Sequence, residues 1–278
     1  ERDGICAYSD DKVRVEMVSE IAGARDYTVD GFGNQAYRLV VTPEDITIQA
    51  VDQDGVWNAK ATLAQLVANC GGTIPCMEIV DWPSFKVRGW LLDIGRSYFS
   101  VEEIKREMDL LSRFKINYFH WHLTENQAWR MEIKAYPQLT AASSMTRDAG
   151  RYYTQQECRE VVEYAKERGI LVVPEIDMPG HSEAFTRAMG FNMASAQGQE
   201  ALKVILGEVA EVFKESPYIH IGADETSVTA AFVKAMSDRV RELGKKCVTW
   251  NPINVAVTPE NGIDACQLWS TNGNYARG

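Results

Sequence analysis

Short apolar runs alternate with amphipathic stretches over residues 86–278, and this alternation constrains the fold more than any other feature of the sequence. The first run, VRGWLLDIGR, has the composition of a strand. The stretch that follows it, VEEIKREMDLLSRFK, places Ile104, Met108 and Leu111 on one stripe at helical spacing. Strands that alternate with helices form a parallel sheet covered by crossover helices. The pattern therefore predicts a domain of (β/α) type over residues 86–278.

The same alternation continues almost to the end of the printed chain. Further strands are predicted in INYFHWHL, ILVVPEID, YIHIGADE, KCVTWN and ACQLWS, and further helices in TQQECREVVEYAKERG, QEALKVILGEVAEVFKE and FVKAMSDRVRELG. These runs make six strands of β/α type, whereas a closed TIM-type barrel has eight strands and is about 250 residues long. We therefore expect a (β/α)8 TIM-type barrel of which about six strands are present, with the C-terminal strands missing from this chain.

The first part of the chain follows a different pattern. The runs YRLVVT (37–42) and ITIQAV (46–51) alternate β-branched and polar residues, and a Pro-Glu-Asp turn signal separates them. A helical stretch, NAKATLAQLVANC, follows and is ended by a pair of glycines. We expect a small N-terminal α/β domain over residues 1–80, joined to the barrel by DWPSF at 81–85.

The charge balance of the chain excludes some classes of partner. Its net charge is -10 and its pI is near 5.0, whereas nucleic acids and anionic membranes are bound by basic patches. No run of about 18 apolar residues is present, so no membrane span is predicted. A neutral ligand such as a sugar is compatible with this composition.

Neither the cysteines nor the first residues of the sequence indicate the cellular compartment. None of the six cysteines shows the spacing of a metal finger. Cys70 and Cys76 flank a short glycine-containing loop and could form a disulfide in an oxidising compartment. The first residues, ERDGICAYSD, lack the basic and then apolar layout of a signal peptide.

Polar and aromatic side chains gather at the ends of the predicted strands, whereas the strand interiors are apolar. In (β/α) barrels the reactive groups come from the C-terminal ends of the strands. The side chains at these ends are Asp93, Arg96, His120, His122, Glu125, Glu175, Asp177, His181, His220, Asp224, Glu225, Trp250 and Trp269. A purely structural barrel has no reason to place carboxylates, imidazoles and indoles at one rim. The bias therefore predicts a functional site there.

Asp224 and Glu225 are the leading catalytic candidates. Side chains alternate between faces in a strand, so adjacent residues reach one site only where the chain bends at the strand exit. Two neighbouring carboxyls separate each other's pKa values, which gives one protonated acid beside one carboxylate. Such a pair suits glycosidic bond cleavage, with an acid for the leaving oxygen and an anion for the positive charge that develops at the sugar. The alternative is a solvated Asp-Glu pair that caps the following helix, and spacing alone does not choose between the two.

The tryptophans and an arginine at the same rim favour a sugar pocket. Indoles stack on the apolar faces of sugar rings and enclose small groups such as methyls. A single tryptophan is more often a core residue, but Trp250 and Trp269 follow successive strands. The donor fork of Arg96 suits vicinal hydroxyls or a carboxylate. Alternatively, Arg96 pairs with Asp93 or Asp177.

The histidines also allow a metal-dependent hydrolase. His120 and His122 share one strand face, and together with His181 and Asp224 they resemble the ligand set of a metal-dependent amidohydrolase. However, His120 and His220 lie within apolar runs, where a hydrogen-bonded core histidine is the better interpretation. His181 lies in a Pro-Gly-His loop and is better placed to meet a site carboxylate. We therefore predict no metal and no cofactor, with the metal hydrolase kept as an alternative.

Four segments, taken in order, resemble one known family. RGWLLDIGRSYF, NYFHWHLTENQAWR, VVPEIDMPGHSEAF and HIGADE are similar to the motifs of glycoside hydrolase family 20, the β-N-acetylhexosaminidases. The resemblance extends from about residue 36 to residue 270. The N-terminal part of the chain resembles the small α/β domain that precedes the barrel in this family.

The resemblance implies an exo-acting hydrolase that removes terminal N-acetylglucosamine or N-acetylgalactosamine from glycans. It also implies a substrate-assisted, retaining mechanism in which the 2-acetamido oxygen attacks the anomeric carbon and gives an oxazolinium intermediate. By this analogy Asp224 orients the acetamido group, and Glu225 is the general acid and then the base. A non-catalytic sugar-binding protein on the same scaffold is a further alternative.

The resemblance also assigns roles to the other rim residues. Arg96 would bind ring hydroxyls, Glu125 and His181 would form a polar relay behind Glu225, Asp177 would belong to the substrate-binding set, and Trp250 and Trp269 would line the acetamido pocket. The family shows paired aspartates where this chain has Glu125 and Asn126. The family further implies a secreted, periplasmic or other degradative location.

Overall fold

The computed structural model describes residues 4–25, 29, 31–226, 229–251 and 258–269. Ser270, the last residue of the predicted final strand, lies outside the described part. The chain divides into two compact units. The first unit comprises Glu1–Trp90, Lys105–Tyr118 and Ala165–Ile170, and the second comprises Leu91–Ile104, Phe119–Tyr164 and Leu171–Gly278.

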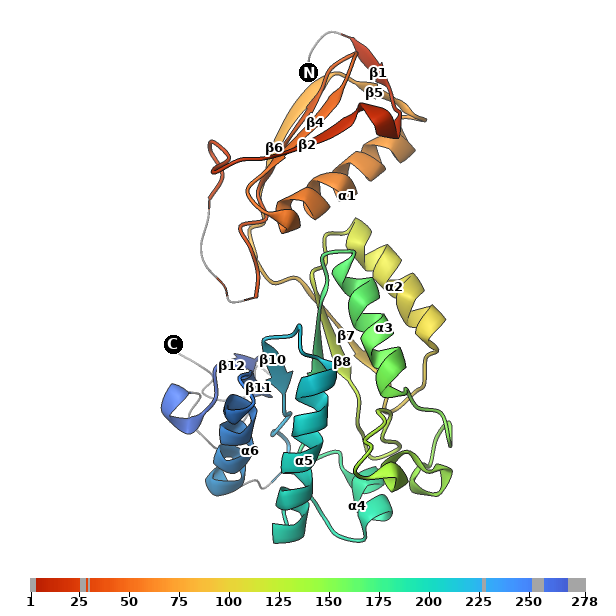
Figure 1. Cartoon of the computed structure of the whole chain (residues 1–278), viewed down its shortest axis with the longest axis vertical. Coiled ribbons are helices and arrows are strands. Elements are labelled where there is room, and N and C mark those ends of the chain that lie inside the picture. Colours follow the sequence, from red (N-terminus) through yellow and green to blue (C-terminus); the bar gives the residue numbers. More distant parts are fainter. Residues whose placement is uncertain (1–3, 26–28, 30, 227–228, 252–257, 270–278) are drawn as a thin grey trace. The chain divides into compact units, whose positions relative to one another are not determined.

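The first unit contains a four-stranded sheet with one long helix (Figure 1). The strand order of this sheet is β2 (Val13–Met17), β4 (Ile46–Ala50), β3 (Tyr37–Val41), β6 (Met77–Asp81). A separate two-stranded sheet is formed by β1 (Ile5–Ala7) and β5 (Thr73–Pro75). The helix is α1 (Gln53–Asn69). Alternate residues of β3 and β4 are buried, as the alternating pattern predicts. These residues form one apolar core with the buried side of α1.

Helix α1 begins five residues earlier than the apolar pattern predicts, at Gln53 rather than Asn58. The Asp52 side chain caps the helix by accepting a hydrogen bond from the Gly55 amide at 2.8 Å. Strands β1, β2, β5 and β6 were not predicted. β1 and β5 have three residues each, and β2 has no buried residue, so neither a long apolar run nor clean alternation marks them.

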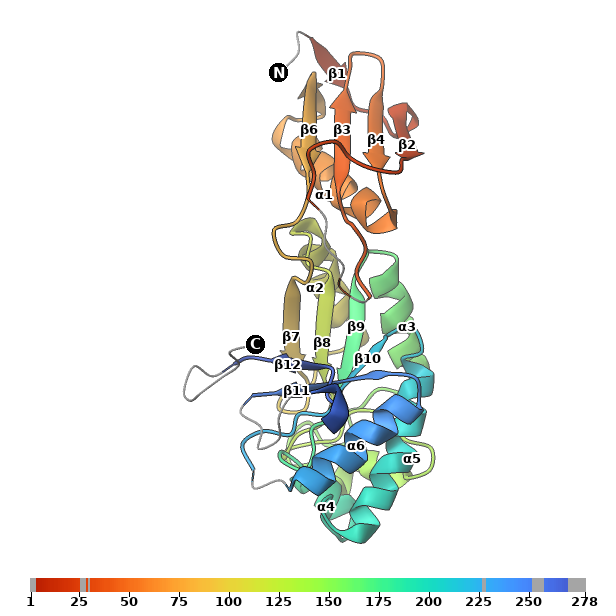
Figure 2. The same ribbon diagram turned by 90° about the vertical axis from the view of Figure 1, so that its left-hand side faces the viewer.

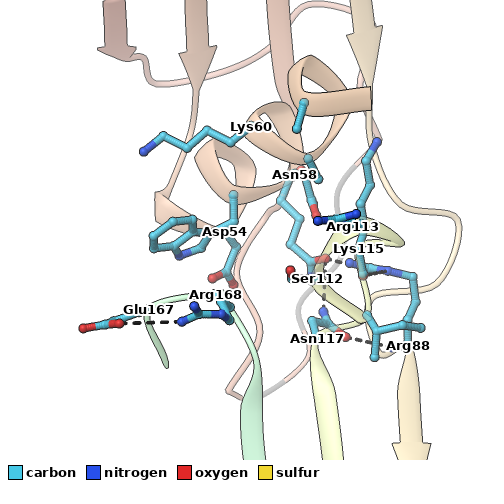
Figure 3. Close-up of a pocket in the computed structure, with 16 residues that line it drawn as sticks. Asp54, Asn58, Lys60, Arg88, Ser112, Arg113, Lys115, Asn117, Glu167 and Arg168 are labelled. Atoms are coloured by element: carbon cyan, nitrogen blue, oxygen red, sulfur yellow. Dashed lines mark hydrogen bonds and ion pairs between the residues drawn. The ribbon is translucent and has the colours of Figure 1, made fainter. Parts of the chain in front are cut away.

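A charged pocket of about 220 Å³ lies within the first unit (Figure 3). Trp57 and Lys60 line it from α1, and Lys115 and Arg168 also line it. Lys115 forms an ion pair with Asp81 at 2.8 Å, and Arg168 forms one with Asp109 at 2.6 Å. Two of its cations are therefore already paired with carboxylates, and none of the predicted site residues lines this pocket.

The second sheet contains all six strands that the alternation predicts, and Figure 2 shows it face-on with a marked curl. Its order is β12 (Ala265–Gln267), β11 (Lys246–Trp250), β10 (Tyr218–His220), β9 (Leu171–Glu175), β8 (Tyr118–His122), β7 (Gly89–Asp93). Pairing is parallel between β9 and β10, β10 and β11, and β11 and β12. The predicted fold class, a TIM-type (β/α) sheet preceded by a small α/β part, is confirmed.

Helices connect these strands along the chain. They are α2 (Val101–Arg113), α3 (Gln155–Lys166), α4 (Glu183–Met189), α5 (Ala196–Val212) and α6 (Ala230–Glu242). Ser100 and Glu103 form the side-chain to backbone bonds of a capping box before α2. The short α4 was not predicted. In the described part of the chain, no helix has the length and apolar character that a membrane span requires.

The domain boundaries stay a prediction. The compact units place residues 105–118 and 165–170 with the N-terminal part, whereas the sequence assigns them to the barrel domain 86–278. All six cysteines are free thiols, so Cys70 and Cys76 are not bridged in this structure.

Candidate active site

A pocket of about 300 Å³ lies where the strands of the curled sheet end. Its lining residues are Leu91, Asp93, Arg96, His122, Glu125, Asp177, His181, Asp224, Glu225, Trp250 and Trp269. All eight predicted site residues are among them, although they come from six different strand ends. The convergence follows from the parallel sheet, because the C-terminal ends of its strands share one edge.

The backbone turns sharply between β10 and the catalytic candidates. β10 ends at His220, and the backbone has positive φ at Gly222 (65°), Ala223 (75°) and Glu225 (56°). A Cβ atom on Gly222 would lie 1.8 Å from Asp177 Oδ1, so only glycine fits there. This bend releases Asp224 and Glu225 from strand alternation, and both reach the same pocket.

The two catalytic candidates have different surroundings. Asp224 is only 5% exposed, and its Oδ2 accepts a hydrogen bond from the Trp269 indole at 2.7 Å. Burial raises the pKa of Asp224, the Trp269 hydrogen bond opposes the rise, and the neighbouring charge of Glu225 adds to it. The side chain of Glu225 is 47% exposed at the pocket. Burial, more than the neighbouring carboxylate, is therefore the main cause of the raised pKa of Asp224.

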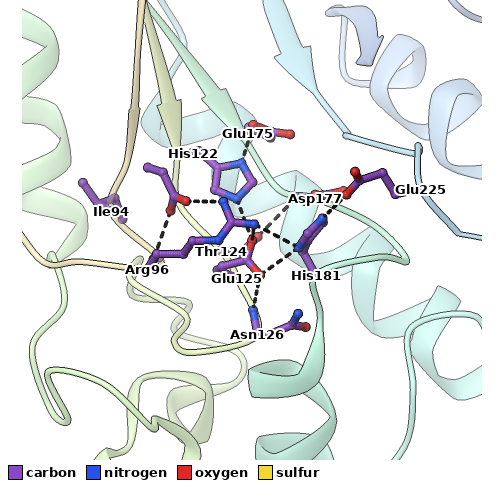
Figure 4. A network of polar contacts seen from close by, with 12 residues as sticks. Ile94, Arg96, His122, Thr124, Glu125, Asn126, Glu175, Asp177, His181 and Glu225 are labelled. Carbon is purple, nitrogen blue, oxygen red and sulfur yellow. Dashed lines mark hydrogen bonds and ion pairs between the residues drawn. The ribbon is translucent and has the colours of Figure 1, made fainter. Parts of the chain in front are cut away.

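Glu225 lies at the end of a hydrogen-bonded chain (Figure 4). Its Oε2 is 2.9 Å from His181 Nε2, and His181 Nδ1 is 2.8 Å from Glu125 Oε1. The Glu125 hydrogen bond, against the effect of burial, raises the pKa of His181 to about 9. Burial raises the pKa of Glu125, but hydrogen bonds from His122 and His181 outweigh it and lower the value to about 2. We call Glu125–His181–Glu225 the relay.

The loop after β8 holds Glu125 in place. The Glu125 amide donates to the Ala128 carbonyl at 3.0 Å, which closes a tight turn. Gly95 packs directly beneath it, since a Cβ there would lie 2.4 Å from Glu125 Cβ. Fully buried Arg130 donates to the carbonyl of Ile94 at 2.9 Å and so joins the loops after β7 and β8.

Arg96 meets carboxylates on both sides. Its Nη1 is 2.6 Å from Asp93 Oδ2, and its Nη2 is 2.9 Å from Glu125 Oε2. The pairing with Asp93 that the sequence left open is therefore present, and half of the side chain stays exposed at the pocket. Two anions hold the guanidinium in position, where its remaining donors can face a ligand.

The two indoles form different parts of the pocket. Trp269 is 52% exposed, so it is not a core residue. Trp250 donates its Nε1 hydrogen to Glu175 Oε1 at 2.7 Å, and its ring stacks on His120 at 5.1 Å between centroids. Trp250 therefore has one fixed edge below the pocket, while it still contributes to the lining.

Asp177 is almost completely buried. It is 2% exposed, and its carboxyl packs against Gly222. Burial and the charge of Glu175 raise its pKa well above the ordinary value. Within the described part of the chain, Asp177 Oδ1 has no hydrogen-bond partner although the residue lines the pocket.

The histidine set proposed for a metal does not gather in this structure. Among the residues described, His120, His122, His181 and Asp224 do not form a group with ligand atoms within 4.8 Å of one another. Triads that do meet this distance centre on Glu175 or Glu125. Glu175 Oε2 contacts His120 Nε2 at 2.7 Å and His122 Nδ1 at 2.5 Å. These are hydrogen-bond lengths, shorter than the spacing between two ligands of one ion.

The sequence placed three further residues at the predicted rim but gave them no role in sugar binding or catalysis. Asp93 and His122 line the pocket, and Glu175 lies directly beneath it in contact with His122. Spacing carried a signal for Glu175, since it lies two residues before Asp177 and alternate strand residues share a face. Leu91 shares the face of Asp93 in β7 for the same reason.

A parallel (β/α) sheet with a carboxylate pair, a histidine relay and two pocket-lining indoles at its C-terminal edge defines the class of barrel glycoside hydrolases. Comparison with known sequences gives the family. Residues 85–201 match "Glycosyl hydrolase family 20, catalytic domain", and residues 9–82 match "Glycosyl hydrolase family 20, domain 2". The chain belongs to glycoside hydrolase family 20.

Individual relatives agree with this assignment. The chain is 39% identical to a beta-hexosaminidase of Vibrio furnissii over 68% of this chain and 37% of the relative. It is 32% identical to a beta-N-acetylhexosaminidase of Cellulomonas fimi over 88% of this chain and 55% of the relative. The chain thus spans between about a third and just over half of these curated relatives.

Solved structures show the same fold. The beta-N-acetylhexosaminidase of Bacteroides fragilis superposes with a TM-score of 0.76 at 35% identity, over 85% of this chain and 56% of that one. The Streptomyces coelicolor GH20 enzyme gives 0.79 at 27% identity, over 95% and 58%. A Streptomyces plicatus N-acetyl-beta-hexosaminidase, solved with Thio-NAglucal, gives 0.78 at 28% identity, over 95% and 58%.

Proposed function

We propose that the whole protein is an exo-β-N-acetylhexosaminidase that removes terminal N-acetylglucosamine or N-acetylgalactosamine from glycans. The observation that carries this proposal is the pairing of buried Asp224 with exposed Glu225, where Glu225 is 2.9 Å from a histidine of raised pKa. The pocket, at about 300 Å³, is at the small end of the range for ligand sites. That size supports capture of one terminal sugar.

In the first step of the proposed reaction, the acetamido oxygen of the substrate attacks the anomeric carbon. Glu225 donates its proton to the glycosidic oxygen, the bond to the leaving group breaks, and an oxazolinium ion forms. Asp224 accepts a hydrogen bond from the acetamido N–H and stabilises the positive charge that develops on the ring. The Trp269 hydrogen bond to Asp224 supports this role, because it fixes the carboxyl in one orientation.

In the second step, Glu225 removes a proton from water, which attacks the anomeric carbon. The bond to the acetamido oxygen breaks, and the product keeps the β-configuration. The exposure of Glu225 supports this exchange with water, and the contact with His181 at 2.9 Å holds the carboxyl at the pocket. No protein nucleophile is required.

The substrate class and the location are proposed by analogy with relatives. A Vibrio harveyi enzyme of this fold is an exo beta-N-acetylglucosaminidase in complex with N-acetylglucosamine. We extend that substrate class to this chain, with a glycan ending in N-acetylhexosamine as its partner. A secreted, periplasmic or other degradative compartment is the location at which such glycans are met.

Hydrolysis of p-nitrophenyl β-N-acetylglucosaminide and its galacto epimer by the whole protein, with and without EDTA, tests the proposal. Release that persists in EDTA and is absent for p-nitrophenyl β-glucoside supports it. Loss of release in EDTA would instead support the metal-dependent hydrolase. Binding of the acetamido sugar without any release would support the non-catalytic sugar-binding protein.

A further inference from the structure

Glu175 is a fully buried carboxylate beneath the proposed active site. It is the last residue of β9, has 0% exposure and does not line the pocket. Its two oxygens have different partners. Oε1 accepts from the Trp250 indole at 2.7 Å and lies 3.3 Å from His220 Nδ1. Oε2 contacts His122 Nδ1 at 2.5 Å and His120 Nε2 at 2.7 Å. A buried charge is retained only where such partners compensate its loss of hydration.

His122 connects Glu175 to the relay. While Nδ1 faces Glu175, Nε2 lies 3.5 Å from Glu125 Oε2. Burial lowers the pKa of His122, but the carboxylates of Glu175 and Glu125 raise it well above its ordinary value. The ring therefore carries a hydrogen on both nitrogens. Glu175, His122, Glu125 and His181 form a row of alternating negative and positive charges that ends at Glu225 (Figure 4).

His220, on the other side of Glu175, behaves differently. Its Nδ1 accepts a hydrogen bond from the Gly222 amide at 3.1 Å, which requires an unprotonated nitrogen. Burial lowers the pKa of His220 to about 4, so the ring is neutral at physiological pH. His220 thus anchors the bend before Asp224. The charge of Glu175 is balanced mainly by His122.

We propose that Glu175 is a positioning residue of the hydrolytic site. One of its oxygens holds Trp250, which lines the pocket, and the other holds Glu125 of the relay through His122. The inference rests on the function proposed above and deepens it. Neither oxygen reaches the pocket, so Glu175 acts through these partners. Trp250 and Glu125 come from strands on opposite sides of β9, and a single carboxylate fixes the distance between them.

Glu175→Gln separates charge from shape. The amide is isosteric, its oxygen still accepts from Trp250, and its NH₂ group still meets His122 once that ring has lost a proton. The variant therefore keeps the packing, removes the negative charge of residue 175 and leaves His122 neutral. The charged or titratable groups that face His122 and His181 are Asp93, Arg96, His120, Glu125, Glu175, Asp177, His220, Asp224 and Glu225.

We expect kcat of Glu175→Gln to fall about tenfold to 100-fold, with KM changed less than about threefold, because a relay with an altered charge distribution affects the transition state more than binding. Neutral His122 no longer repels the proton on His181. The basic limb of the pH profile of kcat/KM should therefore move to higher pH. In the NMR spectrum, the His122 ring should lose its proton at lower pH than in the wild type.

Glu208→Gln is the matched control. Glu208 is a partly buried carboxylate that accepts from the amides of Lys134 and Ala135 at 2.7 and 2.8 Å, and it does not line the pocket. Its loss should lower stability without moving the pH profile. His122→Gln completes a double-mutant cycle with Glu175→Gln. If the two residues act as one unit, the double variant is no slower than the slower single variant.

The outcomes are distinct. A wild type that hydrolyses N-acetylhexosaminides, combined with a shifted profile in Glu175→Gln and none in Glu208→Gln, supports the positioning role. An active wild type with identical profiles in all variants overturns the positioning role and leaves the proposed function intact. A wild type without hydrolysis overturns the proposed function itself, and with it the inference.

Discussion

Asp224 and Glu225 are neighbours in the sequence, but the structure gives them different environments. Asp224 is buried against the Trp269 indole, while Glu225 is exposed and contacts His181. The strand-end pattern predicted that both would reach one pocket, because (β/α) sheets collect side chains at one edge. It did not predict which residue would be buried, since that depends on the bend after β10.

Glu225→Gln tests the assignment of the acid. The amide cannot donate a proton to the leaving oxygen, so we expect kcat to fall by about 100-fold or more. Binding of N-acetylglucosamine, measured by calorimetry, should stay nearly unchanged, because shape and polarity are retained. A large loss of affinity with little loss of kcat would contradict the assigned role.

Asp224→Asn should have a different signature. An amide neither carries the negative charge nor accepts the acetamido N–H as well as a carboxylate. We therefore expect a lower kcat together with weaker binding of an oxazoline-like inhibitor, measured as an inhibition constant. Equal and mild losses in the Asp224 and Glu225 variants would argue against both roles.

At the scale of elements, the parallel sheet was the most predictable part. Its strands are apolar runs bounded by helices, and burial on both faces makes such runs continuous. Helices α1 and α5 begin before the apolar pattern does, because Asp52 and Ser195 cap them through side-chain hydrogen bonds. Short α4 and the three-residue strands lack the length over which periodicity becomes visible.

The bend after β10 makes Gly222 a sensitive position. Gly222→Ala would place a Cβ 1.8 Å from Asp177 Oδ1 in a backbone of φ 65°, so the loop must move. We expect loss of most activity and a reduced Tm. Gly207→Ala in α5 is the control, because its nearest atom lies 3.5 Å away and alanine favours helix. Similar behaviour of the two variants in kcat and in thermal unfolding would show that the bend is not critical.

For the whole molecule, the sequence predicted a small α/β part followed by a TIM-type sheet, and family 20 matches cover both parts. The compact units of the structure divide the chain differently, because residues 105–118 and 165–170 pack with the N-terminal part. A linear pattern cannot show this, since it records the order of elements and not their partners. The depth of Glu175 was missed for the same reason.

The relay links stability to pH. The pKa of Glu125 is lowered from 4.5 to about 2, so its contribution is full above pH 4.5 and is lost as pH falls through 2. The pKa of His181 is raised from 6.5 to about 9, so its contribution is full below pH 6.5 and is lost as pH rises through 9. Both contributions to stability are therefore complete only between pH 4.5 and pH 6.5.

Glu125→Gln should therefore reduce the free energy of unfolding most between pH 4.5 and 6.5, by on the order of 2 kcal/mol. The difference from wild type should narrow toward pH 9. Denaturant unfolding across this range measures it. The control is Glu200→Gln, which removes an exposed pair with Lys203 and should change stability little at any pH. A pH-independent difference for Glu125→Gln would contradict the relay's charge state.

Substrate assistance is the central claim, and a series of p-nitrophenyl glycosides with increasingly fluorinated N-acetyl groups tests it most directly. Each fluorine withdraws electrons from the acetamido oxygen, so an attacking oxygen becomes a weaker nucleophile. We predict that log kcat/KM of the whole protein falls steeply and steadily from acetamido to trifluoroacetamido substrates. A flat series would mean that the acetamido oxygen does not attack, and it would contradict the mechanism built on Asp224 and Glu225.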